Sequence, residues 1–209
     1  EGLSYEDAAI AADAVNTNWH CMRERAKIAP HDDILLIGAA GGVGVHGIQV
    51  AKAFGARVIA VDISDEKLEF AKKWGADEII NVRAVQDVSE AAKKLTDGRG
   101  VDAAVDYVGA SETFTAAIEA LAVAGRAVLI GAKPSSVQIN PLDLLIGEKT
   151  ITGSRHSTRT ELMETMDVMA KGTIKSAIGK RVHFTEVESL FEDLQAETLL
   201  GRGALTYDN

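Results

Sequence analysis

Short apolar runs alternate with amphipathic stretches through most of the chain. The runs have the length and composition of buried strands and lie at residues 34–37, 58–61, 78–81, 102–108, 126–130 and 150–153. Apolar residues recur with helical spacing at residues 65–74, 85–95, 113–122 and 159–170. This alternation predicts right-handed crossovers and an α/β fold, with a doubly wound parallel sheet of the Rossmann kind and helices on both faces.

The two ends of the chain follow a different pattern. Residues 1–30 have helical periodicity before any strand begins. Residues 174–209 indicate a strand at 180–184, an amphipathic helix at 187–196 and a last strand at 204–207. Neither end has the form of a sheet crossover, so we expect both to pack on another part of a protein.

The first strand leads into a glycine-rich turn and a helix. Gly41, Gly42 and Gly44 open this helix, and the next strand ends at Asp62, about 20 residues further on. A helix N-terminus offers unpaired N–H groups and a positive dipole end to a pyrophosphate, while glycine lets the backbone approach it. A carboxylate at Asp62 can accept both ribose hydroxyls and would repel a 2′-phosphate. The unit therefore predicts a dinucleotide site that prefers NAD to NADP.

One position departs from the common glycine pattern. Counted back from Gly44, the first glycine of G-x-G-x-x-G is replaced by Ala39, and Gly38 lies one residue earlier. Alanine permits the turn where its φ stays negative.

The amino-acid composition limits which binding partners and which cellular compartment are expected. Hydrophobic residues make up 46% and charged residues 25%, and no apolar run approaches the ~20 residues of a membrane span. The chain shows no signal-peptide pattern, and its single Cys21 excludes an intrachain disulfide, so a reducing, cytoplasmic location is expected. A net charge of −9 argues against nucleic acid as a partner.

Several segments together resemble the medium-chain dehydrogenase/reductase superfamily, and its zinc-type alcohol dehydrogenase branch in particular. They are LSYEDAA, IGAAGGVG, VIAVDISDEK, KKWGADEIINV, GVDAAVDYVGA, GRAVLIGA, ITGSRHSTR and GRGALTY. The resemblance implies that residues 1–25 are crossing helices from a GroES-like catalytic domain absent from this chain. It implies an NAD-binding Rossmann domain at 26–171 and a C-terminal return segment at 172–209.

The resemblance also implies roles for individual residues. Thr17 would pack beside the nicotinamide ring and Val43 behind it, whereas Ile63 and Lys67 would join Asp62 at the adenosine ribose. Gly109, Gly131 and Ala132 would hold the nicotinamide ribose and carboxamide, and Arg159 would contact the pyrophosphate. Four of these residues also have an ordinary structural explanation: a helix start for Thr17 and Arg159, core packing for Val43, and a solvated surface charge for Lys67.

A metal position follows from the same resemblance. Asp13 matches a late ligand of the catalytic zinc, although an aspartate that caps a helix explains it equally well. One carboxylate cannot hold zinc, because a catalytic site needs three protein ligands. The five histidines are scattered without metal-ligand spacing, and none forms a recognisable catalytic pair with a nucleophile.

These observations favour an NAD-dependent oxidoreductase that transfers hydride between an alcohol or carbonyl substrate and nicotinamide. A zinc-independent quinone or enoyl reductase and a truncated, non-catalytic nucleotide-binding module remain alternatives. We expect zinc in the intact parent only, and no dehydrogenase activity from this chain alone. Residues 136–139 resemble an edge strand that pairs with a two-fold mate, so a homodimer or tetramer is expected.

Overall fold

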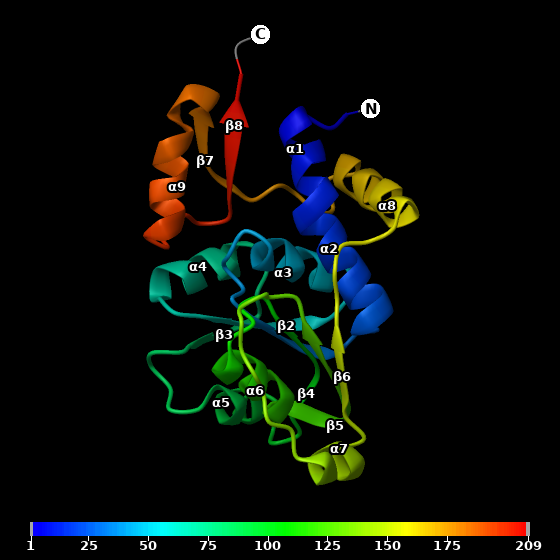
Figure 1. The fold of residues 1–209 in the computed structure, drawn as a ribbon. Coiled ribbons are helices and arrows are strands. Elements are labelled where there is room, and N and C mark those ends of the chain that lie inside the picture. The colour runs from blue at the N-terminus through cyan, green and yellow to red at the C-terminus, as the bar shows by residue number, and fades with distance from the viewer. Residues whose placement is uncertain (1, 208–209) are drawn as a thin grey trace.

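Six parallel strands form the central sheet of the computed structural model, which describes residues 2–207 (Figure 1). The strands are β1 (Asp33–Ile37), β2 (Arg57–Asp62), β3 (Glu78–Asn81), β4 (Val101–Asp106), β5 (Leu121–Leu129) and β6 (Thr150–Gly153). Their spatial order is β3-β2-β1-β4-β5-β6, which confirms the doubly wound arrangement. The order reverses between β1 and β4, so their carboxyl ends meet where this fold binds ligands.

Helices cover both faces of the sheet (Figure 1). One face carries α3 (Gly44–Ala53) and α4 (Asp65–Lys73), and the other carries α5 (Val88–Lys94) and α6 (Ser111–Glu119). Neighbouring strand residues point to opposite faces, so Leu36 joins the core under α3 whereas Leu35 joins the core under α6. Both faces of the sheet are therefore buried, as the uninterrupted apolar strands require.

A long helical segment lies along one side of this domain. It comprises α1 (Tyr5–Ile10), η1 (Ala11–Val15), α2 (Asn16–His20) and η2 (Cys21–Arg25), and the two η stretches have wider, π-type turns. Its apolar residues share the core of β1 and α3, and α2 also packs on α8 (Arg159–Ala170). The Trp19 indole donates to Glu164, and His20 pairs with the buried Glu161 of α8. The segment is thus fixed against the glycine-turn helix.

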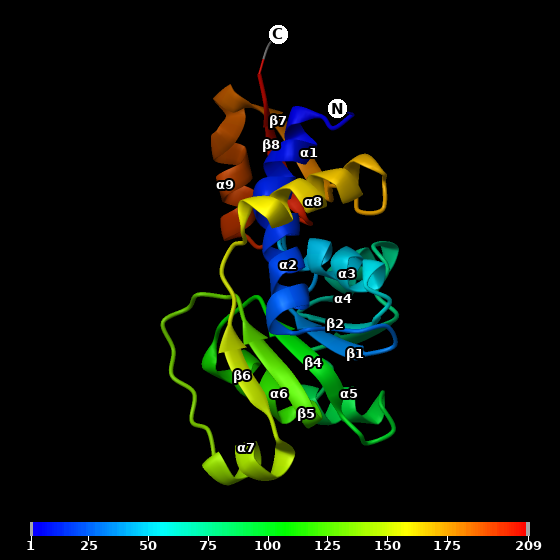
Figure 2. The same ribbon diagram turned by 90° about the vertical axis from the view of Figure 1, so that its right-hand side faces the viewer.

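The C-terminal residues form a second, smaller sheet. It contains β7 (Ile178–His183) and β8 (Arg202–Thr206), which pair in parallel, together with η3 (Phe184–Glu186) and α9 (Val187–Gln195). Figures 1 and 2 both place this unit beyond α3, at the end of the molecule where the described N-terminal residues also lie. No helix within residues 2–207 is long and apolar enough to cross a membrane.

The structure departs from the sequence expectations mainly around β5. This strand begins at Leu121, within the stretch 113–122 that we expected to be helical, and α6 ends at Glu119. Strand propensity depends strongly on context, and here the pairing of Leu121 with Val101 of β4 determines the element. The pairing register then shifts before Ala103, where Ala124 of β5 has φ of +61°.

Two features follow β5 along the chain. Residues 136–139, expected as an edge strand, form no strand with the described residues 2–207 and run as an extended connection. After them comes α7 (Pro141–Gly147), which the sequence analysis missed, at the far end from the C-terminal sheet (Figure 2). Asn140 caps this helix and Pro141 takes its first position.

Ion pairs connect the strands at the edge of the sheet where the strands begin. Arg57 pairs with Asp33 and Glu78, and Arg99 pairs with Asp33 and Asp102. The carboxylate of Asp102 contributes most to the raised pKa of Arg99. These ion pairs tie the starts of β1, β2 and β4 together, whereas the carboxyl edge carries the cavities described next.

Candidate functional site

The glycine turn joins β1 to α3 through very close backbone contacts. The positive φ of this turn, +78°, belongs to Gly38. The described residues with positive φ do not include Ala39. The alanine therefore fits the turn under the condition set from sequence. A Cβ on Gly44 would lie 2.3 Å from the carbonyl oxygen of Gly38, so the turn requires glycine at position 44.

A second close approach joins this turn to the C-terminal sheet. A Cβ on Gly42 would lie 2.8 Å from Cδ of Arg202 and 3.1 Å from the carbonyl oxygen of Gly201. Gly42 thus lets the β8 segment rest on the turn. The N–H groups of Val45 and His46 already donate to the carbonyls of Gly41 and Val43. The backbone that the helix start can offer to an anion is therefore that of the glycine turn, up to the Gly44 N–H.

The Asp62 carboxylate lies at the end of β2 and faces the turn. Its Oδ2 accepts from the Ala40 N–H at 2.9 Å, and its Oδ1 accepts from the Ile63 N–H at 2.9 Å. Lys67 Nζ lies 3.9 Å from Oδ1. A carboxylate has about four acceptor positions, so two remain for a ligand with paired hydroxyls. The backbone bonds fix the carboxylate before any ligand arrives.

These residues surround one cavity, which we call the glycine-turn cleft. Its volume is about 460 Å³. Seven of the residues expected from sequence line it: Gly41, Gly42, Val43, Gly44, Asp62, Ile63 and Lys67. Ile37, Gly38 and Val61 adjoin these residues in sequence. Residues from other segments complete the wall, namely Val82, Tyr107, Val108, Thr113, Lys133, Asp193, Leu194, Glu197, Leu199 and Gly201.

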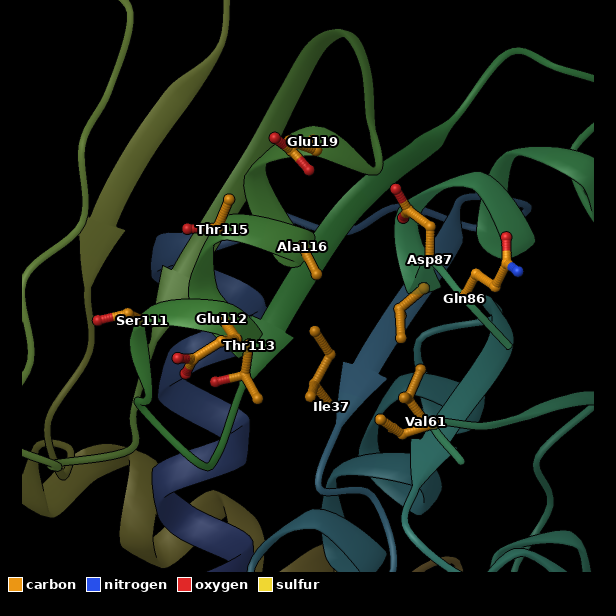
Figure 3. Close-up of a pocket in the computed structure, with 12 residues that line it drawn as sticks. Ile37, Val61, Gln86, Asp87, Ser111, Glu112, Thr113, Thr115, Ala116 and Glu119 are labelled. Atoms are coloured by element: carbon orange, nitrogen blue, oxygen red, sulfur yellow. The ribbon is translucent and has the colours of Figure 1, made fainter. Parts of the chain in front are cut away.

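A second cavity, the lateral cavity, adjoins this cleft and also has a volume of about 460 Å³ (Figure 3). The two cavities share Ile37, Val61, Val82 and Thr113. Ile37 and Val61 form an apolar floor between the α6 side chains and Asp87 (Figure 3). Polar groups lie around it, namely Gln86, Asp87, Ser111, Glu112, Thr115 and Glu119. An apolar floor with a polar rim suits a flat heterocycle.

Helix α3 holds the C-terminal segment through two buried side chains. His46 Nε2 accepts from the Ala177 N–H at 3.1 Å, so Nδ1 carries the proton and donates to the Gly42 carbonyl at 2.9 Å. Gln49 donates to the Lys175 carbonyl and accepts from the Lys175 N–H. Burial lowers the pKa of His46 to about 4, and the nearby Arg202 charge acts in the same direction.

The remaining predicted residues lie outside the lining of the glycine-turn cleft, although the structure describes all of them. Thr17 is buried in α2, and Arg159 is exposed at the first position of α8. Gly109 and Gly131 bring the ends of β4 and β5 into backbone contact, since a Cβ on Gly109 would lie 2.5 Å from the Gly131 carbonyl. Ala132 follows them and is exposed.

The predicted metal ligand has a different partner here. Asp13 forms an ion pair with Arg202 of β8. Among residues 2–207, no three His, Cys, Asp or Glu side chains come together in a way that could hold a metal ion. The described residues therefore do not form a zinc site, and Asp13 connects the N-terminal helical segment to the C-terminal sheet.

Sequence reasoning missed several residues that shape the cleft. Tyr107 and Thr113 follow the end of β4, where the rule for strand ends could have indicated them. Asp106, fully buried, accepts from the Val108 and Gly109 N–H groups and from the Thr113 hydroxyl, and so holds this corner. The contacts of Gly201 and Arg202 had no local signal, because their partners are far away in sequence.

A family model described as zinc-binding dehydrogenase matches residues 42–171, from the glycine turn through α8. This match covers more than half of the chain. The chain belongs to the zinc-binding dehydrogenase family.

Individual family members extend the match to almost the whole chain. An NAD-dependent alcohol dehydrogenase of Sulfurisphaera tokodaii is 30% identical over 97% of this chain and 58% of its own length. The crystal structure of AibC is 33% identical, with a TM-score of 0.89 over 100% of this chain and 62% of that one. An acetophenone reductase from Geotrichum candidum, solved in complex with NAD, is 27% identical, with a TM-score of 0.84 over 99% and 57% of the two chains. The present chain thus spans somewhat more than half the length of these relatives.

The buried His46 predicts a loss of stability in mild acid. The folded protein keeps His46 neutral down to about pH 4, whereas the unfolded chain takes up a proton near pH 6.5. The stability that neutral His46 contributes is therefore fully present above pH 6.5. It decreases as the pH falls from 6.5 toward 4. We expect His46 to lower the free energy of unfolding by about 2 kcal/mol between pH 7.5 and pH 5.

Urea unfolding at the two pH values measures this effect. His46→Asn should flatten the pH dependence, and His156→Asn, at an exposed position, should leave it as in the unchanged protein. If His46→Asn loses as much unfolding free energy between pH 7.5 and pH 5 as the unchanged protein, other groups cause the acid sensitivity.

Proposed function

We propose that the glycine-turn cleft binds NAD(H), and that the chain is the cofactor-binding part of an alcohol dehydrogenase-like oxidoreductase. The observation that carries this proposal is the fixed Asp62 carboxylate facing a turn in which Gly44 has no room for a side chain. The S. tokodaii relative, named as NAD-dependent, supports the same cofactor.

The pyrophosphate of the cofactor fits the start of α3. Gly41, Gly42 and Gly44 would let the pyrophosphate approach the backbone of the glycine turn and the Gly44 N–H. The stem of Arg202 packs on Gly42. Its guanidinium, which pairs with Asp13 in this structure, is one candidate to add charge-assisted hydrogen bonds to these phosphates. Arg159 is a second candidate for this role, from the start of α8.

The adenosine half fits the side of the cleft next to the lateral cavity. Asp62 would accept from the two ribose hydroxyls, with Ile63 and Lys67 beside it. The adenine ring would then lie over the apolar floor of Ile37 and Val61. The adenosine half of the dinucleotide therefore has a matching surface.

The nicotinamide half would lie on the other side of the turn. Nicotinamide supplies reversible hydride transfer when bound, here between the cofactor and an alcohol or carbonyl substrate. Val43 would support the ring from behind and Thr17 from α2, and backbone groups of Gly109, Gly131 and Ala132 would hold its ribose and carboxamide. The protein's contribution is orientation of the reacting face.

Cofactor preference gives the most direct test. We expect tighter binding of NADH than of NADPH, because Asp62 accepts from the ribose hydroxyls and repels an added phosphate. Asp62→Ala should weaken NADH binding by roughly tenfold or more, since a charge-assisted hydrogen bond contributes ~1.5–3 kcal/mol. Calorimetric titration measures both affinities. Glu66→Ala removes a nearby exposed carboxylate and serves as the control; equal or tighter binding of NADPH by the unchanged chain would contradict the proposal.

The 209-residue chain taken alone should show no alcohol dehydrogenase activity and retain no stoichiometric zinc. Asp13 is a single carboxylate and is paired with Arg202, whereas a catalytic zinc needs three protein ligands. The metal would stabilise the developing alkoxide by several kcal/mol, which corresponds to several powers of ten in rate. Metal analysis after dialysis, together with an NADH-absorbance assay on short-chain and secondary alcohols, tests both parts. One bound zinc per chain, or robust turnover, would refute this prediction.

We also expect a dimer that uses the region of residues 136–139 and α7. Leu142, Leu145 and Ile146 of this helix are 55%, 74% and 70% exposed, which is unusual for a group of large apolar residues. The adjacent β6 is an edge strand of the sheet. Light scattering should show a dimer that Ile146→Asp disrupts, while Met163→Asp, on the exposed side of α8, leaves it intact. A monomer at high concentration would contradict the proposal.

A further inference from the structure

Asn18 uses its whole amide in buried hydrogen bonds beside the glycine turn. Its Nδ2 donates to the Ala14 carbonyl at 2.7 Å and to the Val43 carbonyl at 2.8 Å. Its Oδ1 lies 2.5 Å from Tyr107 Oη. The side chain is fully buried on α2. Of its partners, Ala14 lies on η1, Val43 lies in the glycine turn and Tyr107 follows β4.

The direction of each bond follows from chemistry. Backbone carbonyls only accept, so the atom of Asn18 that faces two of them must be the NH₂ group. The other atom is then the amide oxygen, and the Tyr107 hydroxyl must be its donor. Tyr107 also lines the glycine-turn cleft, so this hydroxyl connects the cleft wall to α2.

The Val43 carbonyl is the point where this network meets the turn. Val43 is the N-cap residue of α3, and its oxygen also accepts from the N–H groups of His46 and Gly47. In a trans peptide the C=O and the following N–H point in opposite directions. The bonds to the Val43 oxygen hold it pointing into α3. The Gly44 N–H of the same peptide must then point away from the helix. Gly44 and Val43 both line the cleft.

Gly47 shows that the fold makes room for this network. Glycine in the interior of a helix destabilises it relative to alanine. A Cβ on Gly47 would nevertheless lie 2.1 Å from Tyr107 Oη and 2.8 Å from Asn18 Oδ1. Even a methyl group at this position would displace the hydroxyl from its partner.

We infer that Asn18 and Tyr107 are positioning residues for the cofactor: they orient the Val43–Gly44 peptide, and through it the N–H group and the valine side chain presented to the dinucleotide. This role rests on the proposed function. In this role Tyr107 acts through the hydrogen bond from its hydroxyl to Asn18, not only through its place in the cleft lining. The adenosine end, held at Asp62, does not depend on it.

Titration with NADH and with adenosine separates these two ends of the cleft. Tyr107→Phe keeps the ring and removes the hydroxyl, and it should weaken NADH binding about three- to tenfold while leaving adenosine binding unchanged. The fluorescence of bound NADH should change as well, since Val43 lies at the nicotinamide side. Tyr5→Phe, at a residue that is 97% exposed, is the matched control and should alter neither ligand.

A double-mutant cycle tests whether the two residues act as one unit. The pair Asn18→Ala/Tyr107→Phe should weaken NADH no more than Asn18→Ala alone, because the shared bond is already lost. If Asn18→Ala does not fold, the Tyr107→Phe titration decides alone. Unchanged NADH affinity in Tyr107→Phe, or equal losses for NADH and adenosine, would overturn the inference. A wild-type chain that binds adenosine but not NADH would also overturn it, and one that binds neither would refute the proposed function itself.

Discussion

Close backbone packing between the end of β1 and the start of α3 is the constraint on which the cleft depends. The Gly38 carbonyl lies so near Gly44 that no side chain fits between them. This contact sets where the first turn of α3 begins, and the helix is then buried from Gly44 to Ala51. Its direction cannot change without disturbing both the sheet and the helical segment above it.

Other segments reinforce this placement from several sides. Asp62 holds Ala40 from β2, Asn18 holds Val43 from α2, and His46 connects α3 to Ala177. Each bond joins a side chain to a backbone group, so each fixes the path of the chain as well as a side-chain conformation. A site built in this way is organised before its ligand binds, which lowers the entropy lost on binding.

The sequence was sufficient for features that depend on local pattern. The doubly wound parallel sheet followed from the alternation of apolar runs with helices. The glycine turn and Asp62 followed from the spacing of the motif, whereas Val43, Ile63 and Lys67 were expected only from the family resemblance. Leu121 was misassigned because its pairing with Val101 is a long-range choice that local propensity does not determine. The ion pair of Asp13 with Arg202 was beyond prediction for the same reason, since the two residues are separated by 189 positions.

The His46–Ala177 bond has a consequence for biosynthesis. Its partners are separated by 131 positions, and ribosomes add roughly 5–20 residues per second. The imidazole is therefore made roughly 7 to 26 s before the N–H group that it will accept. During that interval the nascent glycine-turn helix has a polar face with no partner from the C-terminal segment. The cleft would reach its final form only after residues 193–201, several of which line it, have also been made.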